Sequence, residues 1–362
     1  MDKRLHSKKQ QIEKEAGNSA LYLLLSFLSG VLETGIFTAG LMQFNISIGL
    51  VLALAYQVGC LVRNPLRLSL KGAACVLCCS VPVLPYIHDS ILVLVVVTSL
   101  VSSGVQSARE CLLPTISPVS LSIKRIFRVS GFICGIIGGF MIELDLLSFV
   151  SLATCLTILP VALRQASKVS WTNLNRRFES DGYGWIMLLH QTHYFAYAYV
   201  LLAILLTHED HSLGVHFLWK PVQASAWFAL GWFSYISGQW LLKKKLKIGA
   251  LHAALIGHAW VAICLFCMAL FLEHHFILGF AWVFGGFGGG SVYAIKELSK
   301  ANECRADIEL WEHWGHIVGV SLSLLSVVIF PYRLFLPFVI AFVAALVTLS
   351  LIAYRNSCVC KR

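Results

Sequence analysis

Long apolar runs alternate with short polar segments along almost the whole chain. A helix of about 20 apolar residues is long enough to cross a bilayer, and the pattern predicts such helices one after another. Two of the gaps, after residues 87 and 143, are so short that the flanking helices must form tight antiparallel hairpins. The runs cover residues 18–42, 44–62, 70–87, 90–107, 128–143, 146–163, 184–206, 223–242, 249–271, 276–295, 314–331 and 334–354. The sequence therefore predicts an all-α integral membrane protein with twelve transmembrane helices.

The composition supports this interpretation and excludes several others. Of 362 residues, 58% are hydrophobic and 13% are charged, and the mean hydropathy is +0.77. A soluble domain carries about a quarter charged residues, so a soluble enzyme, a nucleic-acid-binding protein and a secreted disulfide scaffold are excluded. The net charge of +10 then reflects membrane topology. The expected surroundings are a lipid bilayer, by default the bacterial inner membrane, with no nucleic-acid partner.

The basic residues give the orientation of the predicted helices. If the N-terminus is cytoplasmic and the helices alternate, all of the 28 Lys and Arg residues except Lys220 and Arg333 fall on the cytoplasmic side. A wrong number of spans would scramble this asymmetry. The positive-inside rule therefore favours twelve spans with both termini in the cytoplasm.

A long polar segment in the middle of the chain predicts two halves of six helices each. It contains Ser, Asn, Arg, Glu and Asp and little apolar sequence. The first 17 residues are too polar for a signal peptide. The predicted organisation is a cytoplasmic segment (1–17), an N-terminal bundle (18–163), a cytoplasmic linker (164–183), a C-terminal bundle (184–354) and a cytoplasmic tail (355–362).

Local motifs at the cytoplasmic ends of the helices resemble those of the major facilitator superfamily. After the second run the chain has Gly59, Arg63 and Arg67, without the acidic residue and second glycine of the family motif. After the fourth run it has Arg109-Glu110-Cys111-Leu112-Leu113-Pro114, followed by Arg128 and Gly131-x-x-x-Gly135-x-x-Gly138-Gly139. Ile136 replaces the proline that is typical of the family's antiporters.

The resemblance covers nearly the whole chain and implies a monomeric secondary transporter without a cofactor. Transporters built from two such halves work by alternating access around a site between them. In this comparison the arginines and the glutamate of the two motifs would take part in gating. They are Arg63, Arg67, Arg109, Glu110 and Arg128.

Glu33 is an ionisable side chain at membrane depth, in the middle or outer part of the first run. Such a residue is expensive to bury, and it is a functional hypothesis by default. A lone carboxylate that is protonated when desolvated and ionised when hydrated would suit proton coupling. The alternative is a structural role, in which the carboxyl group ties two helices together by hydrogen bonds.

The seventh run carries the strongest candidate for substrate binding. Spacings of three and four residues place His190, His193, Tyr194 and Tyr197 on one helical face. Two imidazoles and two phenols would be costly against lipid, so this face should line a cavity and bind a proton, a metal ion or a polar ligand. A hydrogen-bond network without substrate contact stays open as the alternative. His190 and His193 are the expected metal ligands.

Other polar residues are weaker candidates. Gln57 and Gln239, near the inner ends of the second and eighth runs, are predicted to line the cavity. His313 and His316 share a helical face and are predicted to form an inner gate, unless they only mark a solvated helix start. His252 and His258 lie six residues apart in the ninth run, so at most one of them can face the cavity.

These observations predict a proton-coupled secondary transporter, not an enzyme. Imidazole ligands favour a transition-metal ion, or a metal chelate such as a metallophore, as the substrate. Two alternatives stay open: an exporter of an organic or drug-like solute, and a membrane factor that delivers a metal or pigment to another protein. Eleven of the thirteen histidines and all ten tryptophans lie after residue 170, so ligand recognition is expected mainly in the second half.

Overall fold

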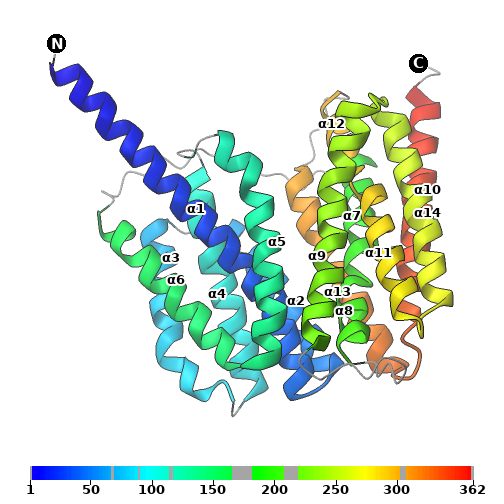
Figure 1. Ribbon diagram of the computed structural model, residues 1–362, viewed down its shortest axis with the longest axis horizontal. Helices are drawn as coiled ribbons and strands as arrows, with labels where there is room; N and C mark the ends of the chain where they lie inside the picture. Colours follow the sequence, from blue (N-terminus) through cyan, green and yellow to red (C-terminus); the bar gives the residue numbers. More distant parts are fainter. Residues whose placement is uncertain are drawn as a thin grey trace. The chain divides into compact units, whose positions relative to one another are not determined.

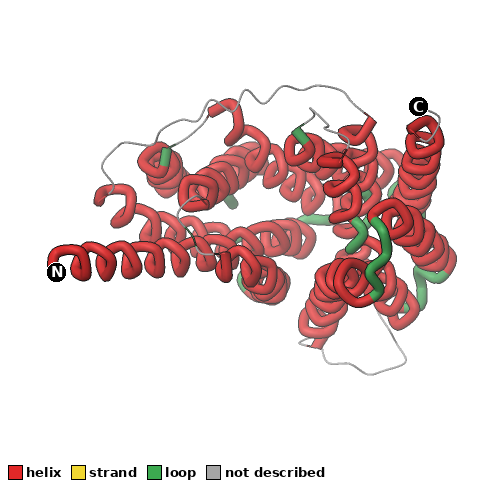
Figure 2. The backbone as a smooth tube through the Cα atoms, turned by 90° about the horizontal axis from the view of Figure 1, so that it is seen from above, coloured by secondary structure: helices red, strands yellow, loops and turns green. Residues whose placement is uncertain are grey.

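The computed structural model describes residues 2–66, 69–88, 90–113, 116, 118–164, 182–207, 219–301 and 307–359, and these residues form helices without any strand (Figures 1 and 2). The helices form two compact units, Met1–Gln43 with Ala55–Thr172, and Phe44–Leu54 with Asn173–Arg362. We call them unit 1 and unit 2. Arg67 and most of the predicted linker lie outside the described residues.

Helices α1 to α6 follow one another along the chain with few residues between them. α5 begins at Pro118, ten residues before the apolar run that predicted it, so Arg128 lies inside a helix and not at its cytoplasmic start. The third run is only partly α-helical, because Pro82 and Pro85 lie in a 3-10 helix that follows α3. The helices are α1 (Asp2–Gln43), α2 (Ile46–Leu66), α3 (Leu70–Ser80), η1 (Val81–Tyr86), α4 (Ile91–Leu112), α5 (Pro118–Met141) and α6 (Asp145–Arg164).

Glycines bring α1 and α5 of unit 1 into close backbone contact (Figure 1). A Cβ atom on Gly131 would lie 2.2 Å from the Phe27 carbonyl oxygen, and one on Gly139 would lie 2.3 Å from the Gly35 carbonyl oxygen. Only glycine leaves room for such an approach. The predicted glycine motif therefore serves helix packing in this unit.

Two of the apolar runs in the second half are interrupted helices. The seventh run is divided at Ala196 and Tyr197, and the tenth at Gly290 and Ser291, where the amide of Ser291 donates to the Gly288 carbonyl in a tight turn. The helices are α7 (Gly182–Phe195), α8 (Ala198–Thr207), α9 (Trp219–Trp240), the π-helical turn η3 (Leu241–Lys245), α10 (Ala250–Leu270), α11 (His275–Gly289), α12 (Val292–Ala301), α13 (Ile308–Ile329) and α14 (Leu336–Val359).

The glycine-rich end of α11 allows it to pack closely against two neighbours. A Cβ atom on Gly286 would lie 2.3 Å from the Gly231 carbonyl oxygen of α9, and one on Gly288 would lie 2.5 Å from the Gly257 carbonyl oxygen of α10. The second contact places the start of α10, and with it His258, beside the interruption between α11 and α12.

Seven helices within the described residues are long and apolar enough to cross a membrane. Two shorter apolar helices, Ile46–Leu61 and Leu70–Tyr86, coincide with the second and third predicted runs. The long ones are Ala16–Gln43, Ile91–Leu112, Asp145–Leu163, Ala250–Leu270, His275–Ala301, Ile308–Ile329 and Leu336–Asn356. The chain is therefore a helical, multi-pass membrane protein.

Candidate functional site

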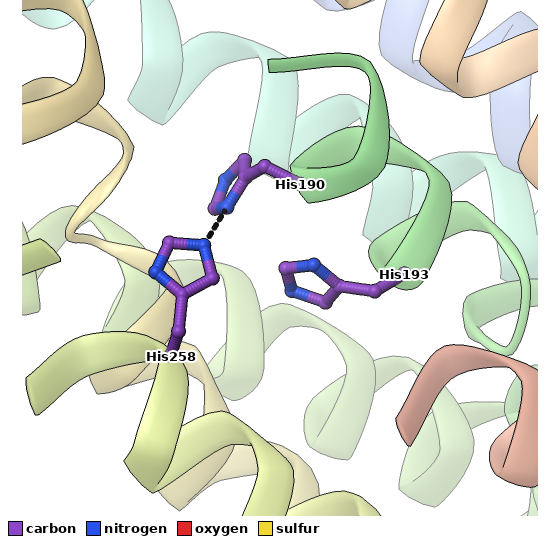
Figure 3. Close-up of side chains that lie close together, drawn as sticks. All are labelled: His190, His193 and His258. Carbon is purple, nitrogen blue, oxygen red and sulfur yellow. Dashed lines mark hydrogen bonds between the residues drawn. The ribbon is translucent and has the colours of Figure 1, made fainter. Parts of the chain in front are cut away.

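Three histidines meet in the interior of unit 2 (Figure 3). His190 and His193 lie one turn apart on α7, and His258 comes from α10. All three rings are buried, with exposed fractions of 0%, 0% and 1%. One nitrogen of each ring lies within 4.8 Å of one nitrogen of each of the others. We call these residues the histidine triad.

Hydrogen bonds set the protonation of two of the rings. Nδ1 of His258 lies 2.7 Å from the Ala254 carbonyl oxygen, and because a carbonyl only accepts, this nitrogen carries the hydrogen. In a neutral imidazole the other nitrogen then accepts. Nδ1 of His190 therefore donates to Nε2 of His258, at 2.9 Å.

The triad leaves buried nitrogen atoms without partners. Nε2 of His190 makes no hydrogen bond within the described part of the chain. The His193 ring interacts with the backbone carbonyl of Leu189 one turn earlier, which engages one of its nitrogens and leaves the other without a partner. Buried polar atoms are nearly always paired, and an exception calls for an explanation such as an absent ion or water. Neutral imidazole nitrogens are good ligands for transition metals, and a ligating histidine commonly donates its other N–H to a backbone carbonyl. His258 already has this arrangement.

Aromatic side chains surround the triad on one side. The ring of Tyr194 lies 5.3 Å from the His193 ring and 6.1 Å from the Tyr197 ring, measured between centroids. Trp282 contacts both tyrosines. The buried hydroxyl of Tyr194 has no hydrogen-bond partner among the described residues. The structure thus brings His190, His193 and Tyr194 together, with Tyr197 one ring further away.

Glu33 lies in unit 1 and is not a lone carboxylate. Its Oε2 accepts hydrogen bonds from Nη2 of Arg128 at 2.6 Å and from Nε at 3.2 Å. Nε2 of Gln57 is 3.5 Å from the other carboxylate oxygen. Glu33 is 3% exposed, whereas the Arg128 side chain is 35% exposed. The pair joins α1 to α5, a contact that the sequence pattern did not reveal.

A second polar group lies next to this pair in unit 1. Nε2 of Gln106 donates to the Ser29 hydroxyl at 3.0 Å, and Nη1 of Arg109 donates to Oε1 of Gln106 at 2.7 Å. The Ser29 and Tyr56 hydroxyls are 2.9 Å apart. Arg109 therefore belongs to an intrahelical and interhelical network in the interior of the unit.

The remaining predicted residues are spread over both units. Glu110 is half-buried on α4, and Arg63 lies on α2 with a side chain outside the described set. Gln239 is half-buried near the end of α9, where Gly290 approaches its backbone nitrogen. The His313 and His316 rings are 5.6 Å apart, which agrees with a shared face.

Sequence reasoning did not identify two features of unit 2. His258 was one of two open choices, because the helical period cannot say which of His252 and His258 points inward; the structure buries His258 and exposes His252. The second feature is a polar group beside the triad: Gln191 bonds to both Glu312 and His316. It joins residues 121 or more positions apart, and no local spacing signals it.

Comparison with known proteins shows a likeness of fold without a likeness of sequence. No protein-family model and no curated protein sequence matches the chain. Among solved structures, the nucleoside transporter NupG superimposes with a TM-score of 0.65 at 15% identity, over 94% of this chain and 98% of that one.

Two further structures match over almost their whole length. A bacterial metal transporter has a TM-score of 0.62 at 12% identity, covering 93% of this chain and 98% of its own. A bacterial homologue of the iron transporter ferroportin, in an inward-facing state, has a TM-score of 0.61 at 12% identity, covering 95% and 98%. The chain thus shares the overall fold of these three transporter structures, which agrees with the architecture that the motif resemblance implies.

Proposed function

We propose that the protein is a secondary active transporter that moves a transition-metal ion, free or as a chelate, by alternating access. Twelve transmembrane helices with both ends in the cytoplasm, a monomeric state and a bacterial inner-membrane location belong to this proposal. The helical fold and the transporter neighbours support it, and the distribution of Lys and Arg supports the orientation.

One observation carries the choice of substrate: the buried histidine triad with unfilled ring nitrogens. Three neutral imidazoles with nitrogens within 4.8 Å of one another match the donor set that zinc, cobalt, nickel, iron and copper accept. A metal would compete directly with the His190–His258 hydrogen bond, since Nε2 of His258 serves both. A metal transporter and an iron-transporter homologue among the structures of similar fold add support.

The experiment is metal binding and transport by the purified, reconstituted protein. Proteoliposomes are loaded with a metal-sensitive dye, and uptake of Co²⁺ and Zn²⁺ is followed for the wild type and for His190→Ala, His193→Ala and His258→Ala. Each triad variant should lower uptake at least about tenfold, in line with the loss of one ligand. His252→Ala is the matched control, because this exposed histidine lies on the same helix as His258.

Uptake that is equal in the wild type and all triad variants would overturn the metal proposal. The organic-solute alternative then becomes the better hypothesis. The nucleoside transporter of similar fold makes a nucleoside a reasonable first organic probe in the same vesicles.

Proton coupling through Glu33 is the second part of the proposal. The carboxylate faces Arg128 of α5 and the side chains of Gln57 and Tyr56 of α2, so release of Arg128 during the cycle would leave it free to take a proton. Glu33→Gln should then flatten the dependence of transport on pH. An unchanged profile, in protein that remains folded, would restrict Glu33 to holding α1 and α5 together.

A further inference from the structure

A metal ion in the histidine triad would lack an anionic ligand. The three imidazoles are neutral, and their rings are almost completely buried. A buried cation without a compensating charge is strongly disfavoured. If the triad binds a divalent cation, as proposed above, a negative group must lie close enough to act on it.

Glu312 of α13 is held against the helix that carries two of the three histidines. Its Oε1 accepts a hydrogen bond from Nε2 of Gln191, the residue after His190, at 3.2 Å. The side-chain amide oxygen of Gln191, Oε1, in turn accepts a hydrogen bond from Nε2 of His316 at 3.2 Å. Because both ends of the amide are engaged, Gln191 fixes the carboxylate on this side of α7.

The other oxygen of the Glu312 carboxylate forms an ion pair with a lysine side chain. Nζ of Lys296 lies 2.7 Å from Oε2 of Glu312, with exposed fractions of 40% and 25% for the two side chains. Through Glu312 this ammonium group is linked to Gln191, the residue next to His190. An ammonium group near the triad opposes the entry of a second cation, whereas the carboxylate favours it.

We infer that Glu312 is the counter-charge of the metal in the triad and that Lys296 is a resident counter-cation that gives way when the metal binds. The inference rests on the proposed metal substrate. In the empty site the Lys296–Glu312 pair is neutral. When a divalent cation enters, repulsion displaces Lys296, and the carboxylate is left to stabilise the metal.

The position of Lys296 couples the replacement of its ion pair by the metal to the helix that carries it. Lys296 lies on the short helix α12, which begins directly after the interruption at Gly290 and Ser291. Its ion pair ties α12 to α13. Loss of the pair removes this tie between α12 and α13, while Glu297 of α12 stays paired with Lys243. Occupation of the triad is thus transmitted to the contact between α12 and α13.

The test measures Co²⁺ affinity of the purified full-length protein by competition with a chromophoric chelator. Lys296→Met should tighten binding more than about tenfold, and Glu312→Gln should weaken it by a similar factor, as expected for a unit charge that acts on a divalent ion at an effective dielectric near 20. Lys296→Arg keeps the charge and should bind like the wild type. Lys300→Met is the control, because Lys300 is exposed on the same helix.

The outcomes separate this inference from the proposed function. A wild type that binds Co²⁺ in a His258-dependent way, with unchanged affinity in Lys296→Met, overturns the role of Lys296 and leaves the metal site in place. A wild type that binds no Co²⁺ or Zn²⁺ overturns the proposed substrate. Elution of each variant as a single species with the wild-type volume serves as the folding check.

Discussion

Unit 1 and unit 2 both bury polar side chains, but they satisfy them differently. In unit 1 the buried carboxylate of Glu33 is paired with Arg128 and approached by Gln57. In unit 2 the buried imidazoles of His190 and His193 keep ring nitrogens without hydrogen-bond partners in the described structure. The buried carboxylate of unit 1 is thus a charge with a partner, whereas two of the buried imidazoles of unit 2 keep unpaired nitrogens.

The difference indicates which of the two interiors is better suited to bind a ligand. A polar group that is satisfied by the protein itself contributes to packing and specificity, and an added ligand has to displace an existing partner. A buried lone pair without a partner costs free energy until something binds to it. By this criterion the triad is the better candidate for the proposed metal site. The Glu33–Arg128 pair joins two helices, and the proposed proton uptake by Glu33 requires that this pair opens first.

The largest effect is expected from a substitution at the close contact between α11 and α10. In Gly288→Ala the new methyl group would lie 2.5 Å from the Gly257 carbonyl oxygen, next to His258. We expect destabilisation of about 3 kcal/mol, the upper part of the range for overpacking, together with loss of Co²⁺ binding. Thermal unfolding in detergent and chelator competition measure the two effects.

Two matched variants complete this experiment. Gly285→Ala on the same helix meets only the Cys264 side chain, at 3.5 Å, and should be tolerated. Gly135→Ala in unit 1 would clash with the Val31 carbonyl oxygen at 2.5 Å; it should lower stability and leave Co²⁺ affinity unchanged. Loss of binding in Gly135→Ala would contradict the assignment of the cargo site to unit 2 alone.

A metal should stabilise the protein through unit 2. At a Co²⁺ concentration of about 100 times Kd, binding to the folded state adds about 2.7 kcal/mol. The midpoint of thermal unfolding should therefore rise for the wild type and stay constant for His190→Ala. Mg²⁺, which prefers oxygen ligands, is the control cation, and an equal shift with Mg²⁺ would argue against a nitrogen site.

The smallest of the three effects concerns the ion pair of unit 1. Arg128→Ala leaves the buried Glu33 carboxylate without its guanidinium partner. Breaking a fully buried pair costs about 3–5 kcal/mol; because Arg128 is 35% exposed, we expect about 2 kcal/mol. Lys124→Ala removes a charge one turn earlier and should have little effect. Altered Co²⁺ affinity in Arg128→Ala would show that the two interiors are coupled.

The helices themselves were largely predictable from the sequence, because apolar runs report burial in lipid directly. Interruptions inside a run were not: residues 184–206 form one predicted span, yet the helix is divided at Ala196 and Tyr197. The start of α5 was also missed, since Ser122, Lys124 and Arg125 interrupt the apolar pattern without interrupting the helix.

Within the candidate site, the sequence identified side chains and missed pairings. Helical spacing placed His190 and His193 on one face, because that relation is local. The partner of Glu33 lies 95 residues away, and the contact of Gln191 with Glu312 spans 121. Such contacts depend on how α1 meets α5 and how α7 meets α13, which hydropathy does not encode.

The hydrogen bond between His190 and His258 has a consequence for the rate of unloading. If the triad binds a metal as proposed, the two rings regain a bond with a net value of about 1 kcal/mol each time the metal leaves. This bond makes the empty state more favourable and weakens metal binding about fivefold. In a storage protein, a hydrogen bond that forms between two ligands in the empty site would be a disadvantage, because it lowers the affinity for the stored metal. In a transporter the same bond would be an advantage, because it favours dissociation of the bound substrate and so shortens the time before the next turnover.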